Sequence, residues 1–263
     1  MSAPPLLAAT GVDICVGSAG KRLVQGLELH LARGEMLAVL GRNGAGKTSL
    51  LTTLAGLQAP SAGQIALCGR PYAGAGRWSA RAAARLRGLL PQSSSDAFPA
   101  SVMETALIGR HPHLGRWSWE GAEDLRIARA ALADVGLQSF EQREVQTLSG
   151  GERQRLAIAT LLTQQPALYL LDEPLAHLDL AHQMAMLELW RRCAAEQQAG
   201  LIIVLHDANL ALRYCQRTLL LFGDGRWRAG ASGDVVCSEQ LGELYGYPMR
   251  ELGDASGRYL LPA

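Results

Sequence analysis

Short apolar runs recur along the chain, each bounded by polar residues or glycine. Four stand out: MLAVL (36–40), ALYLL (167–171), LIIVL (201–205) and TLLLF (218–222). These runs are continuously apolar instead of alternating with polar residues, which is typical of strands buried on both faces of a parallel sheet. The pattern therefore predicts an α/β protein with a mostly parallel sheet covered on both sides.

A polar cluster follows each of the first three runs. The first run leads into GRNGAGKT (41–48), the second into the acid pair at 172–173, and the third into the pair at 206–207. In an open parallel sheet, ligands bind beyond the carboxyl ends of the strands. We therefore expect these three clusters to converge on one site.

The segments around these runs differ in composition and in hydrophobic pattern. Residues 1–34 include LVQGLELHLARG (23–34), whose alternation of apolar and polar residues predicts antiparallel strands at the edge of the fold. Residues 93–165 are rich in Ala, Arg and Leu, and AEDLRIARAALADVGL (122–137) repeats its apolar residues at helical spacing. We interpret this second segment as a helical subdomain inserted between strands.

Composition narrows the class of protein. Among 263 residues, 25 basic and 24 acidic side chains give a net charge of +1, which favours neither nucleic acid nor an anionic membrane as a partner. The five cysteines form no C-x-x-C pair, so neither a zinc site nor a disulfide framework is indicated. The uncharged stretch 48–69 contains Pro, Gly and Gln residues that a bilayer core penalises, and the N-terminus lacks the pattern of a secretory signal. We expect a cytoplasmic globular protein that does not itself cross a membrane.

GRNGAGKT matches the phosphate-loop pattern G-x-x-x-x-G-K-[ST] in full, between a predicted strand and a predicted helix over 49–57. In such a loop the backbone N–H groups turn toward the phosphates, Lys47 reaches the outer phosphates, and the Thr48 hydroxyl can ligate Mg²⁺. A glycine-rich turn that matches by chance is the alternative, which the flanking strand and helix disfavour. The candidate nucleotide-binding residues here are Gly41, Arg42, Asn43, Gly44, Ala45, Gly46, Lys47, Thr48 and Ser49.

Two adjacent carboxylates, Asp172 and Glu173, end a buried strand, where packing explains them poorly because an unpaired buried charge is costly. Beside a phosphate loop, we expect Asp172 to hold Mg²⁺ and Glu173 to polarise the water that attacks the γ-phosphate. A solvated acid pair is the alternative. His206 taken alone is more simply a structural histidine. Its position at a third converging strand end assigns it to the γ-phosphate, as a hydrogen-bond donor that also positions the attacking water.

LSGGERQR (148–155) predicts a second anion site. Two glycines followed by helix formers indicate a helix start, whose unpaired N–H groups and positive dipole end favour an anion. One phosphate loop is enough to hold the phosphates of one nucleotide. The chain therefore has one anion site more than a single nucleotide requires.

The motifs occur in the order and approximate spacing found in the ATP-binding subunits of ABC transporters, and the chain resembles this family over nearly its whole length. They are GRNGAGKT, Pro91–Gln92, LSGGERQR, LYLLDEP (168–174), His177–Asp179 and LHD (205–207). LSGGE is not found in kinases, GTPases or helicases. The resemblance implies one ABC ATPase domain, with a phosphate-loop NTPase core and an N-terminal antiparallel β subdomain (1–92 and 166–234). A helical subdomain (93–165) and a tail (235–263) complete it.

In that family two copies pair head to tail, and each ATP lies between the phosphate loop of one subunit and the LSGGE helix start of the other. The resemblance implies that Ser149, Gly150 and Gly151 bind the γ-phosphate of the partner's ATP, and that Asp179 contacts the opposite site. It also implies that Gln92 senses the γ-phosphate and Mg²⁺ at a hinge to the helical subdomain; a simple surface loop is the alternative. The predicted catalytic residues are Glu173, His206 and Gln92, and the predicted metal-binding residues are Thr48, Gln92 and Asp172.

ALIGRHPHLGRW (106–117) and YGYPMRELGDASGRYLLPA (245–263) resemble segments of the ATPases of metal-chelate importers, which take up ferric siderophores, haem or cobalamin. The resemblance implies a homodimer at the cytoplasmic face of the inner membrane. Its partners would be transmembrane permease subunits and, indirectly, a solute-binding protein, with no nucleic acid. The alternatives are a soluble ABC ATPase acting on nucleic acid or ribosomes, and an ATP-gated regulatory module without transport.

Three local features complete the sequence prediction. The family usually has an aromatic residue shortly after the first strand to stack on adenine, whereas DICVGSAGKR (13–22) has none, so we expect loose base selectivity. His111 and His113 flank a proline with no acid or cysteine nearby, which makes a poor metal site. We expect Trp117 and Trp119 to pack over the helical subdomain, with a place in the permease-binding groove as the alternative.

Overall fold

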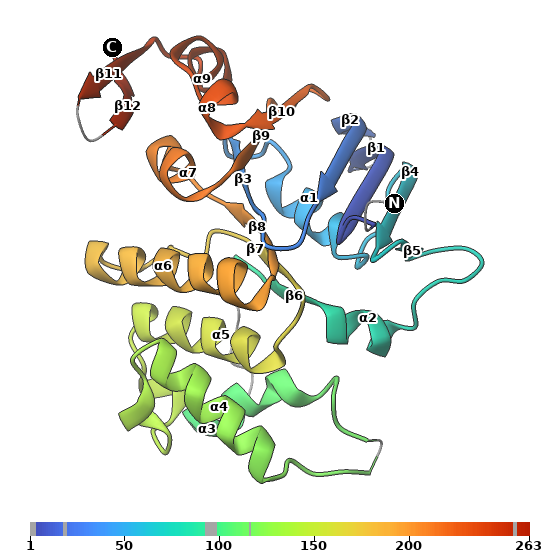
Figure 1. Ribbon diagram of the computed structural model, residues 1–263, viewed down its shortest axis with the longest axis vertical. Helices are drawn as coiled ribbons and strands as arrows, with labels where there is room; N and C mark the ends of the chain where they lie inside the picture. Colours follow the sequence, from blue (N-terminus) through green and yellow to red (C-terminus); the bar gives the residue numbers. More distant parts are fainter. Residues whose placement is uncertain (1–3, 18–19, 93–98, 116, 255–256) are drawn as a thin grey trace.

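The computed structural model describes residues 4–17, 20–92, 99–115, 117–254 and 257–263. Its elements form two larger sheets, a lobe of helices and a C-terminal hairpin. Figure 1 shows the helical lobe at the bottom, the larger sheet in the middle and the N-terminal sheet at the right. Residues 93–98, the start of the predicted helical insertion, lie outside the described residues.

The larger sheet has six strands in the order β10-β9-β3-β8-β7-β6. All neighbouring pairs are parallel except β10 with β9. The four apolar runs are four of its strands, so the predicted mostly parallel sheet is confirmed. The strands are β3 (Met36–Gly41), β6 (Arg87–Leu90), β7 (Leu168–Leu171), β8 (Gly200–Val204), β9 (Arg217–Leu221) and β10 (Trp227–Ala231).

Both faces of this sheet are buried, as continuous apolar strands require. Along β3, Met36, Ala38 and Leu40 pack into a core shared with the helical lobe. The alternate residues Leu37 and Val39 pack into a second core shared with the N-terminal sheet. Burying one such large aliphatic side chain contributes about 1.5–3 kcal/mol. The two cores hold the carboxyl ends of β3, β7 and β8 at one edge.

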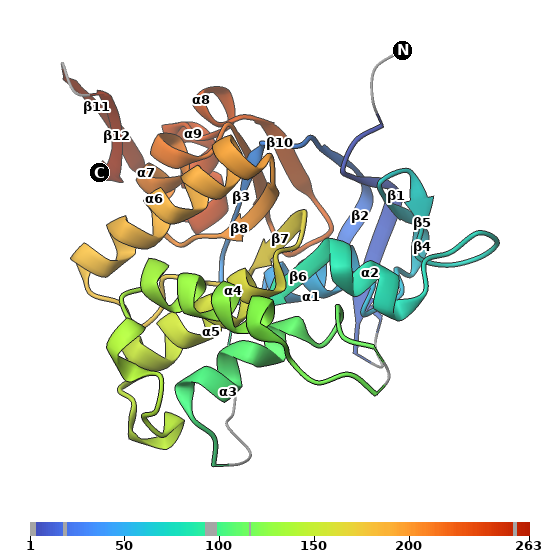
Figure 2. The same cartoon turned by 60° about the horizontal axis from the view of Figure 1, so that its bottom comes forward.

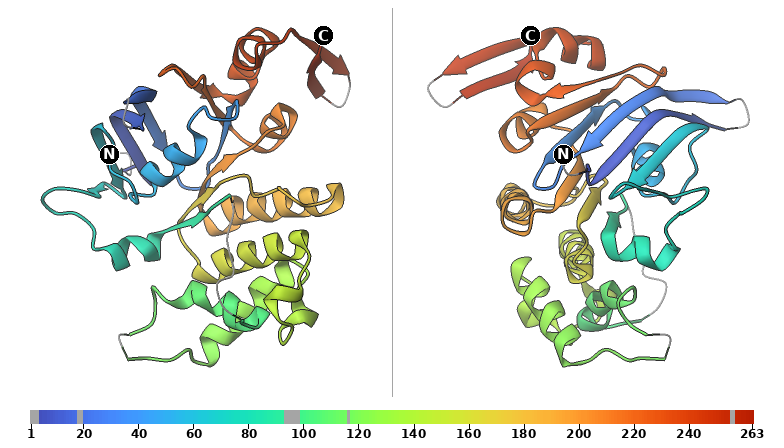
Figure 3. Two further views of the ribbon diagram at one scale, coloured as in Figure 1. Left: turned by 180° about the vertical axis from the view of Figure 1, so that it is seen from behind. Right: turned by 45° about the vertical axis from the view of Figure 1, so that its right-hand side comes forward.

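The N-terminal sheet is antiparallel, in the order β2-β1-β4-β5, which confirms the edge strands expected from residues 1–34. Helix α1 (Lys47–Leu54) lies between this sheet and the larger one (Figure 3), because its buried Leu50, Leu51 and Leu54 share a core with strands of both. It ends before the predicted limit of residue 57. The strands are β1 (Leu7–Val16), β2 (Lys21–Leu31), β4 (Ala62–Leu67) and β5 (Arg70–Pro71).

The predicted helical insertion is present between β6 and β7. Figure 2 shows α3 (Val102–Leu107), α4 (Ala122–Asp134) and α5 (Gly150–Gln164) grouped in one lobe. Short 3-10 turns at Ile108–Arg110, Gln138–Phe140 and Val145–Thr147 link them, and α2 (Ala80–Leu86) precedes β6. The buried Arg110 joins two helices of the lobe, since its guanidinium lies 2.7 Å from the Asp124 carboxylate and also donates to the Thr163 carbonyl at 3.2 Å.

The chain continues from β7 into α6 (Leu180–Gln197) and from β8 into α7 (Ala208–Tyr214). It then forms α8 (Ser232–Val235), α9 (Ser238–Tyr245) and the hairpin of β11 (Met249–Asp254) and β12 (Gly257–Pro262). The Asn209 amide holds the hairpin to α7: it accepts from Leu260 N at 2.8 Å and donates to Leu260 O at 3.1 Å. No helix in the described part of the chain is long and apolar enough to span a membrane.

Candidate active site

The phosphate loop joins β3 to α1. Gly44 and Gly46 adopt left-handed backbone conformations, with φ of 78° and 100°, that other residues rarely adopt. At Gly46 an added Cβ atom would also lie 2.9 Å from Leu23 Cδ1. Glycine is required there both for its backbone conformation and for its close contact with β2.

Lys47 lies back over this loop. Its side chain is only 6% exposed, and Nζ donates to the carbonyl oxygens of Gly41 at 2.9 Å and Arg42 at 3.2 Å. Burial lowers the pKa of Lys47, while the nearby carboxylates of Glu173 and Asp172 oppose that shift. An ammonium group held in this way, with two loop carbonyls as its partners, is suited to bind the outer phosphates of a nucleotide.

A cavity of about 330 Å³ opens over the loop. It brings together predicted residues from the loop, from the end of β6 and from the end of β7, together with one residue that the sequence did not indicate, Leu23. Its lining is Leu23, Asn43, Gly44, Gly46, Lys47, Thr48, Ser49, Gln92 and Glu173. The ends of β3, β6 and β7 therefore meet at this cavity, whereas the third predicted cluster, at 206–207, does not line it.

Thr48 and Asp172 meet on the inner side of the site. The Thr48 hydroxyl donates to Asp172 Oδ2 at 2.6 Å, and Asp172 is 1% exposed. Burial raises the pKa of Asp172, and the Thr48 hydrogen bond opposes that shift. Asp172 Oδ1 is buried without a hydrogen-bond partner among the described residues. A buried carboxylate oxygen beside a hydroxyl is a donor set suited to Mg²⁺, which prefers oxygen ligands and keeps several waters and phosphate oxygens.

Glu173 is held from two sides. Its Oε1 lies 2.9 Å from His206 Nε2, and its Oε2 accepts from Gln92 Nε2 at 3.1 Å. Its backbone is left-handed, with φ of 51°, which is uncommon for a residue with a side chain. The ends of β6, β7 and β8 thus place three predicted catalytic residues in direct contact. A carboxylate fixed at the mouth of a phosphate cavity is placed to accept a proton from a water molecule.

The predicted second anion site is the first turn of α5. Ser149 caps the helix by accepting from Glu152 N at 3.3 Å, and Glu152 Oε2 accepts in return from Ser149 N at 2.7 Å. Gly150 and Gly151 follow, and neither they nor Ser149 lines the phosphate-loop cavity. The two candidate anion sites of one chain are therefore separate.

Asp179 also lies outside that cavity and caps α6. Its Oδ1 accepts from His182 N at 2.9 Å and lies 2.8 Å from His182 Nδ1. These bonds from the backbone and the side chain of His182 lower the pKa of Asp179. His182 was not among the residues predicted from the sequence. The i,i+3 spacing of an acid and a histidine at a helix start is the signal that indicates such a contact.

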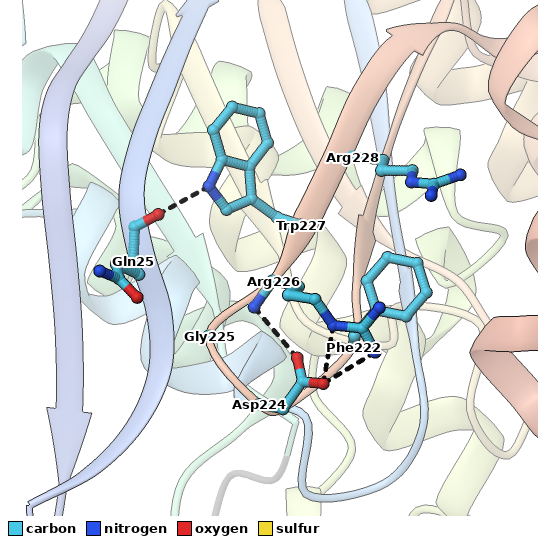
Figure 4. Close-up of a pocket in the computed structure, with 7 residues that line it drawn as sticks. All are labelled: Gln25, Phe222, Asp224, Gly225, Arg226, Trp227 and Arg228. Carbon is cyan, nitrogen blue, oxygen red and sulfur yellow. Dashed lines mark hydrogen bonds and ion pairs between the residues drawn. The ribbon is translucent and has the colours of Figure 1, made fainter.

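A second cavity of about 330 Å³ lies at the turn between β9 and β10 (Figure 4). Its polar groups already bond within the chain. The Arg226 guanidinium contacts Asp224 Oδ2 at 2.9 Å and lies over the Phe222 ring, 4.9 Å from its centroid. Trp227 Nε1 donates to the Gln25 carbonyl at 2.9 Å. These contacts fix the turn against β2, and we assign no ligand to this cavity.

Two local predictions concern residues 106–119. No group of three or more His, Cys, Asp and Glu residues able to hold a metal occurs among the described residues, and the His113 ring bonds the Gln164 carbonyl at 2.9 Å. The expectation that Trp117 and Trp119 pack over the helical lobe is wrong. They are 89% and 90% exposed, so the helices of the lobe do not cover them.

Comparison with known proteins decides the family. Residues 24–176 match the sequence profile described as ABC transporter. The chain belongs to this family. It is 40% identical to the hemin import ATP-binding protein HmuV of Gloeobacter violaceus over 242 residues, 89% of this chain and 85% of that protein. It is 44% identical to HmuV of Deinococcus radiodurans over 214 residues, 80% of this chain and 78% of the other.

Among solved structures, an inward-facing ABC transporter assigned to the metal-chelate type superposes with a TM-score of 0.85 and 29% identity, covering 98% of both chains. The ABC ATPase fold predicted from the motifs is thereby confirmed: an N-terminal antiparallel sheet, a mostly parallel sheet and a helical insertion. As a member of this family, the protein is an ATP-binding ABC transporter ATPase.

Proposed function

We propose that this ATPase powers an importer for a metal chelate, with hemin as the first candidate. The support comes from the relatives: the two compared proteins are named for hemin import, and the solved structure with full coverage is of the metal-chelate type. The proposal places the subunit at the cytoplasmic face of the inner membrane. There it binds transmembrane permease subunits, and a solute-binding protein delivers the chelate to them.

The observation that carries the hydrolytic part of the proposal is the anchoring of Glu173 between Gln92 and His206 beside the phosphate cavity. Glu173 accepts the proton of the attacking water, and His206 donates to the γ-phosphate and positions that water. Gln92 bonds Glu173 just after β6, and in the sequence the helical subdomain follows it, so we propose that the occupancy of the γ-phosphate site affects this hinge.

Binding of the nucleotide rests on the loop itself. The backbone N–H groups of the phosphate loop and the Lys47 ammonium hold the outer phosphates. Thr48 and Asp172 would hold Mg²⁺, directly or through water, with Gln92 beside them. When bound, the ion would neutralise charge on the outer phosphates. With the aliphatic Leu23 lining the cavity and no aromatic residue in the described part of 13–22, we propose that base selectivity is loose.

The dimeric part of the proposal rests on the separation of the two anion sites within one chain. The start of α5 in one copy completes the site at the phosphate loop of the other, so Ser149, Gly150 and Gly151 bind the partner's γ-phosphate and Asp179 approaches the same site. ATP then drives closure of a head-to-tail homodimer, and hydrolysis permits opening. We propose that the core (1–92 and 166–234), the helical subdomain (93–165) and the tail (235–263) make up this one ABC ATPase domain.

The variant Glu173→Gln tests the catalytic and dimeric parts together. We expect ATP binding to persist while the steady-state rate falls about 10²–10⁴-fold, the usual contribution of a general base. ATP should convert the variant into a stable dimer on size-exclusion chromatography with Mg²⁺. Near-normal turnover would overturn the role of Glu173, and a monomer saturated with ATP would overturn the dimer.

The solute is tested with the complete transporter in proteoliposomes. Solute-binding protein loaded with hemin should stimulate ATP hydrolysis and transport, whereas the same protein offered a ferric siderophore or cobalamin should not. Stimulation by one of the other chelates would replace hemin as the solute. If the ATPase isolated from native membranes hydrolyses ATP but carries no permease subunit, a regulatory module that does not transport would be favoured.

A further inference from the structure

The loop between β7 and α6 connects two residues with different expected targets. Glu173 at its start lines the phosphate-loop cavity of its own chain, and Asp179 at its end lies outside that cavity as the cap of α6. Glutamines on two neighbouring helices hold the loop between them. Gln154 of α5 donates to Pro174 O at 3.0 Å, and Gln183 of α6 donates to Leu178 O at 3.0 Å.

The same loop touches the first turn of α5. An added Cβ atom at Gly151 would lie 3.0 Å from His177 O, and one at Gly150 would lie 3.8 Å from His177 Cβ. The glycines therefore allow the start of α5 to pack directly against this loop. Figures 1 and 3 show α5 and α6 side by side, with the chain passing from β7 to α6 across them.

The backbone of the loop is constrained. Glu173 and His177 have φ of 51° and 64°, in the left-handed region that costs a residue with a side chain roughly 1–2 kcal/mol. Such conformations persist only where surrounding contacts hold them. Besides the two side chains that hold the Glu173 carboxylate, the contact from α5 is the Gln154 hydrogen bond to the next residue, Pro174. A small movement of α5 therefore reaches Glu173 through one identifiable bond.

Gln154 lies one helical turn beyond Gly150, on the same face of α5, because residues four apart stack along a helix. The half-buried carboxamide thus moves with the glycine turn that contacts His177. Because a helix moves as a rigid unit, displacement of the first turn of α5 also displaces Gln154. The hydrogen bond from Gln154 then passes this displacement to Pro174.

We propose that Gln154 is a positioning residue that couples the two ATP sites of the dimer. This proposal rests on the proposed head-to-tail dimer. When the start of α5 engages ATP bound to the partner, the Gln154–Pro174 bond sets the position of Glu173 for the ATP bound to its own chain. Each site then hydrolyses efficiently only when the other is occupied, which is positive cooperativity.

The test compares steady-state hydrolysis over a range of ATP concentrations for the full-length chain and three variants. Wild type should give a Hill coefficient clearly above 1. Gln154→Met keeps the length of the side chain but removes the donor, so the Hill coefficient should fall to about 1 with kcat reduced several-fold and single-site ATP affinity unchanged. Gln154→Lys restores an N–H donor and should recover much of the cooperativity.

Gln183→Met is the matched control, since it releases the same loop from α6 without touching α5. It should lower kcat and leave the Hill coefficient at the wild-type value. A wild-type Hill coefficient of 1, an unchanged value in Gln154→Met, or an equal loss in Gln183→Met would each overturn the coupling role of Gln154. The dimer itself is tested separately by ATP-induced dimerisation of Glu173→Gln, so failure of the dimer and failure of the coupling give different results.

Discussion

Glycines lie at the starts of both α1 and α5, yet the first turns of these helices are prepared differently for an anion. The N-cap residue of α1 is Gly46, which has φ of 100° and provides no side-chain cap, and the buried Lys47 follows at once. The N-cap residue of α5 is Ser149, whose hydroxyl and backbone exchange hydrogen bonds with Glu152. One helix start supplies free donors and a cation, and the other has a satisfied cap and a carboxylate.

This difference supports our proposal that one chain has two anion sites, and it predicts that they differ in strength. The hydrogen bond from Ser149 N lowers the pKa of Glu152, so its carboxylate stays ionised at neutral pH and offsets the positive end of the α5 dipole. We therefore expect the start of α1 to bind phosphates by itself, and the start of α5 to contribute only when a partner already holds the nucleotide in place.

The largest effect is expected from a charge on the α5 side. Gly151→Asp places a second carboxylate where the helix approaches the partner's γ-phosphate, and its Cβ meets His177 O at 3.0 Å. ATP binding to one subunit should survive, while hydrolysis falls about 100-fold or more, as for loss of a group that stabilises transition-state charge. Gly151→Ala, with the Cβ but no charge, should lose far less, and equal losses would show that crowding alone is responsible.

Mixed dimers separate the two helix starts most sharply. Doubly tagged heterodimers of Gly151→Asp with Lys47→Ala have one site damaged on both sides and one site intact, whereas neither parental homodimer has an intact site. Heterodimers should trap ATP at one site under non-hydrolysing conditions. If they trap none while both parents remain folded, the sites do not close separately or α5 serves its own chain, and the assignment across the dimer fails.

A smaller loss is expected on the α1 side. Lys47→Ala removes the buried ammonium that lies over the loop carbonyls. Hydrogen bonds to charged groups contribute about 1.5–3 kcal/mol, so the affinity of the monomer for ATP should fall about 10- to 100-fold. Isothermal titration calorimetry measures this, with the exposed Lys21→Ala as control. Unchanged affinity would exclude Lys47 from phosphate binding.

Part of the difference between these two helix starts could be predicted from the sequence, for physical reasons. Local patterns identify the phosphate loop and the strand ends, because a buried parallel strand and a glycine turn each leave their own signature. Leu23 and Gln154 were not identified, since their roles depend on contacts with residues about 20 positions away, at Gly46 and Pro174. The prediction that Trp117 is packed was wrong. An apolar residue in a sequence does not show whether another surface lies close enough to cover its side chain.

The cap of α5 provides a weaker test of the same contrast. Ser149→Ala removes the oxygen that accepts from Glu152 N, and such caps stabilise a protein by roughly 0.5–2 kcal/mol. The thermal midpoint without nucleotide should fall by about 2–4 °C for each kcal/mol in a protein of this size. Ser149→Asp, which caps as well, should retain stability while weakening ATP-driven closure. Loss of stability in both variants would show that the hydroxyl acts through packing.

The smallest effect is expected at Asp179, the cap of α6 and the second residue proposed to approach the partner's ATP. Both the backbone and the ring of His182 bond its carboxylate and lower the pKa of Asp179. Because this pKa is depressed by folding, the carboxylate stabilises the protein above the unfolded pKa, and the contribution is lost as pH falls through the folded value. His182→Ala removes the ring and keeps the backbone donor, so the pKa of Asp179 should rise toward its ordinary value and the acid-induced loss should begin at higher pH. A carboxyl-carbon NMR titration measures this shift, with the exposed His30→Ala as control. An unchanged titration would mean that the backbone bond alone sets the charge of Asp179, and that the His182 ring contributes nothing to the cap of α6.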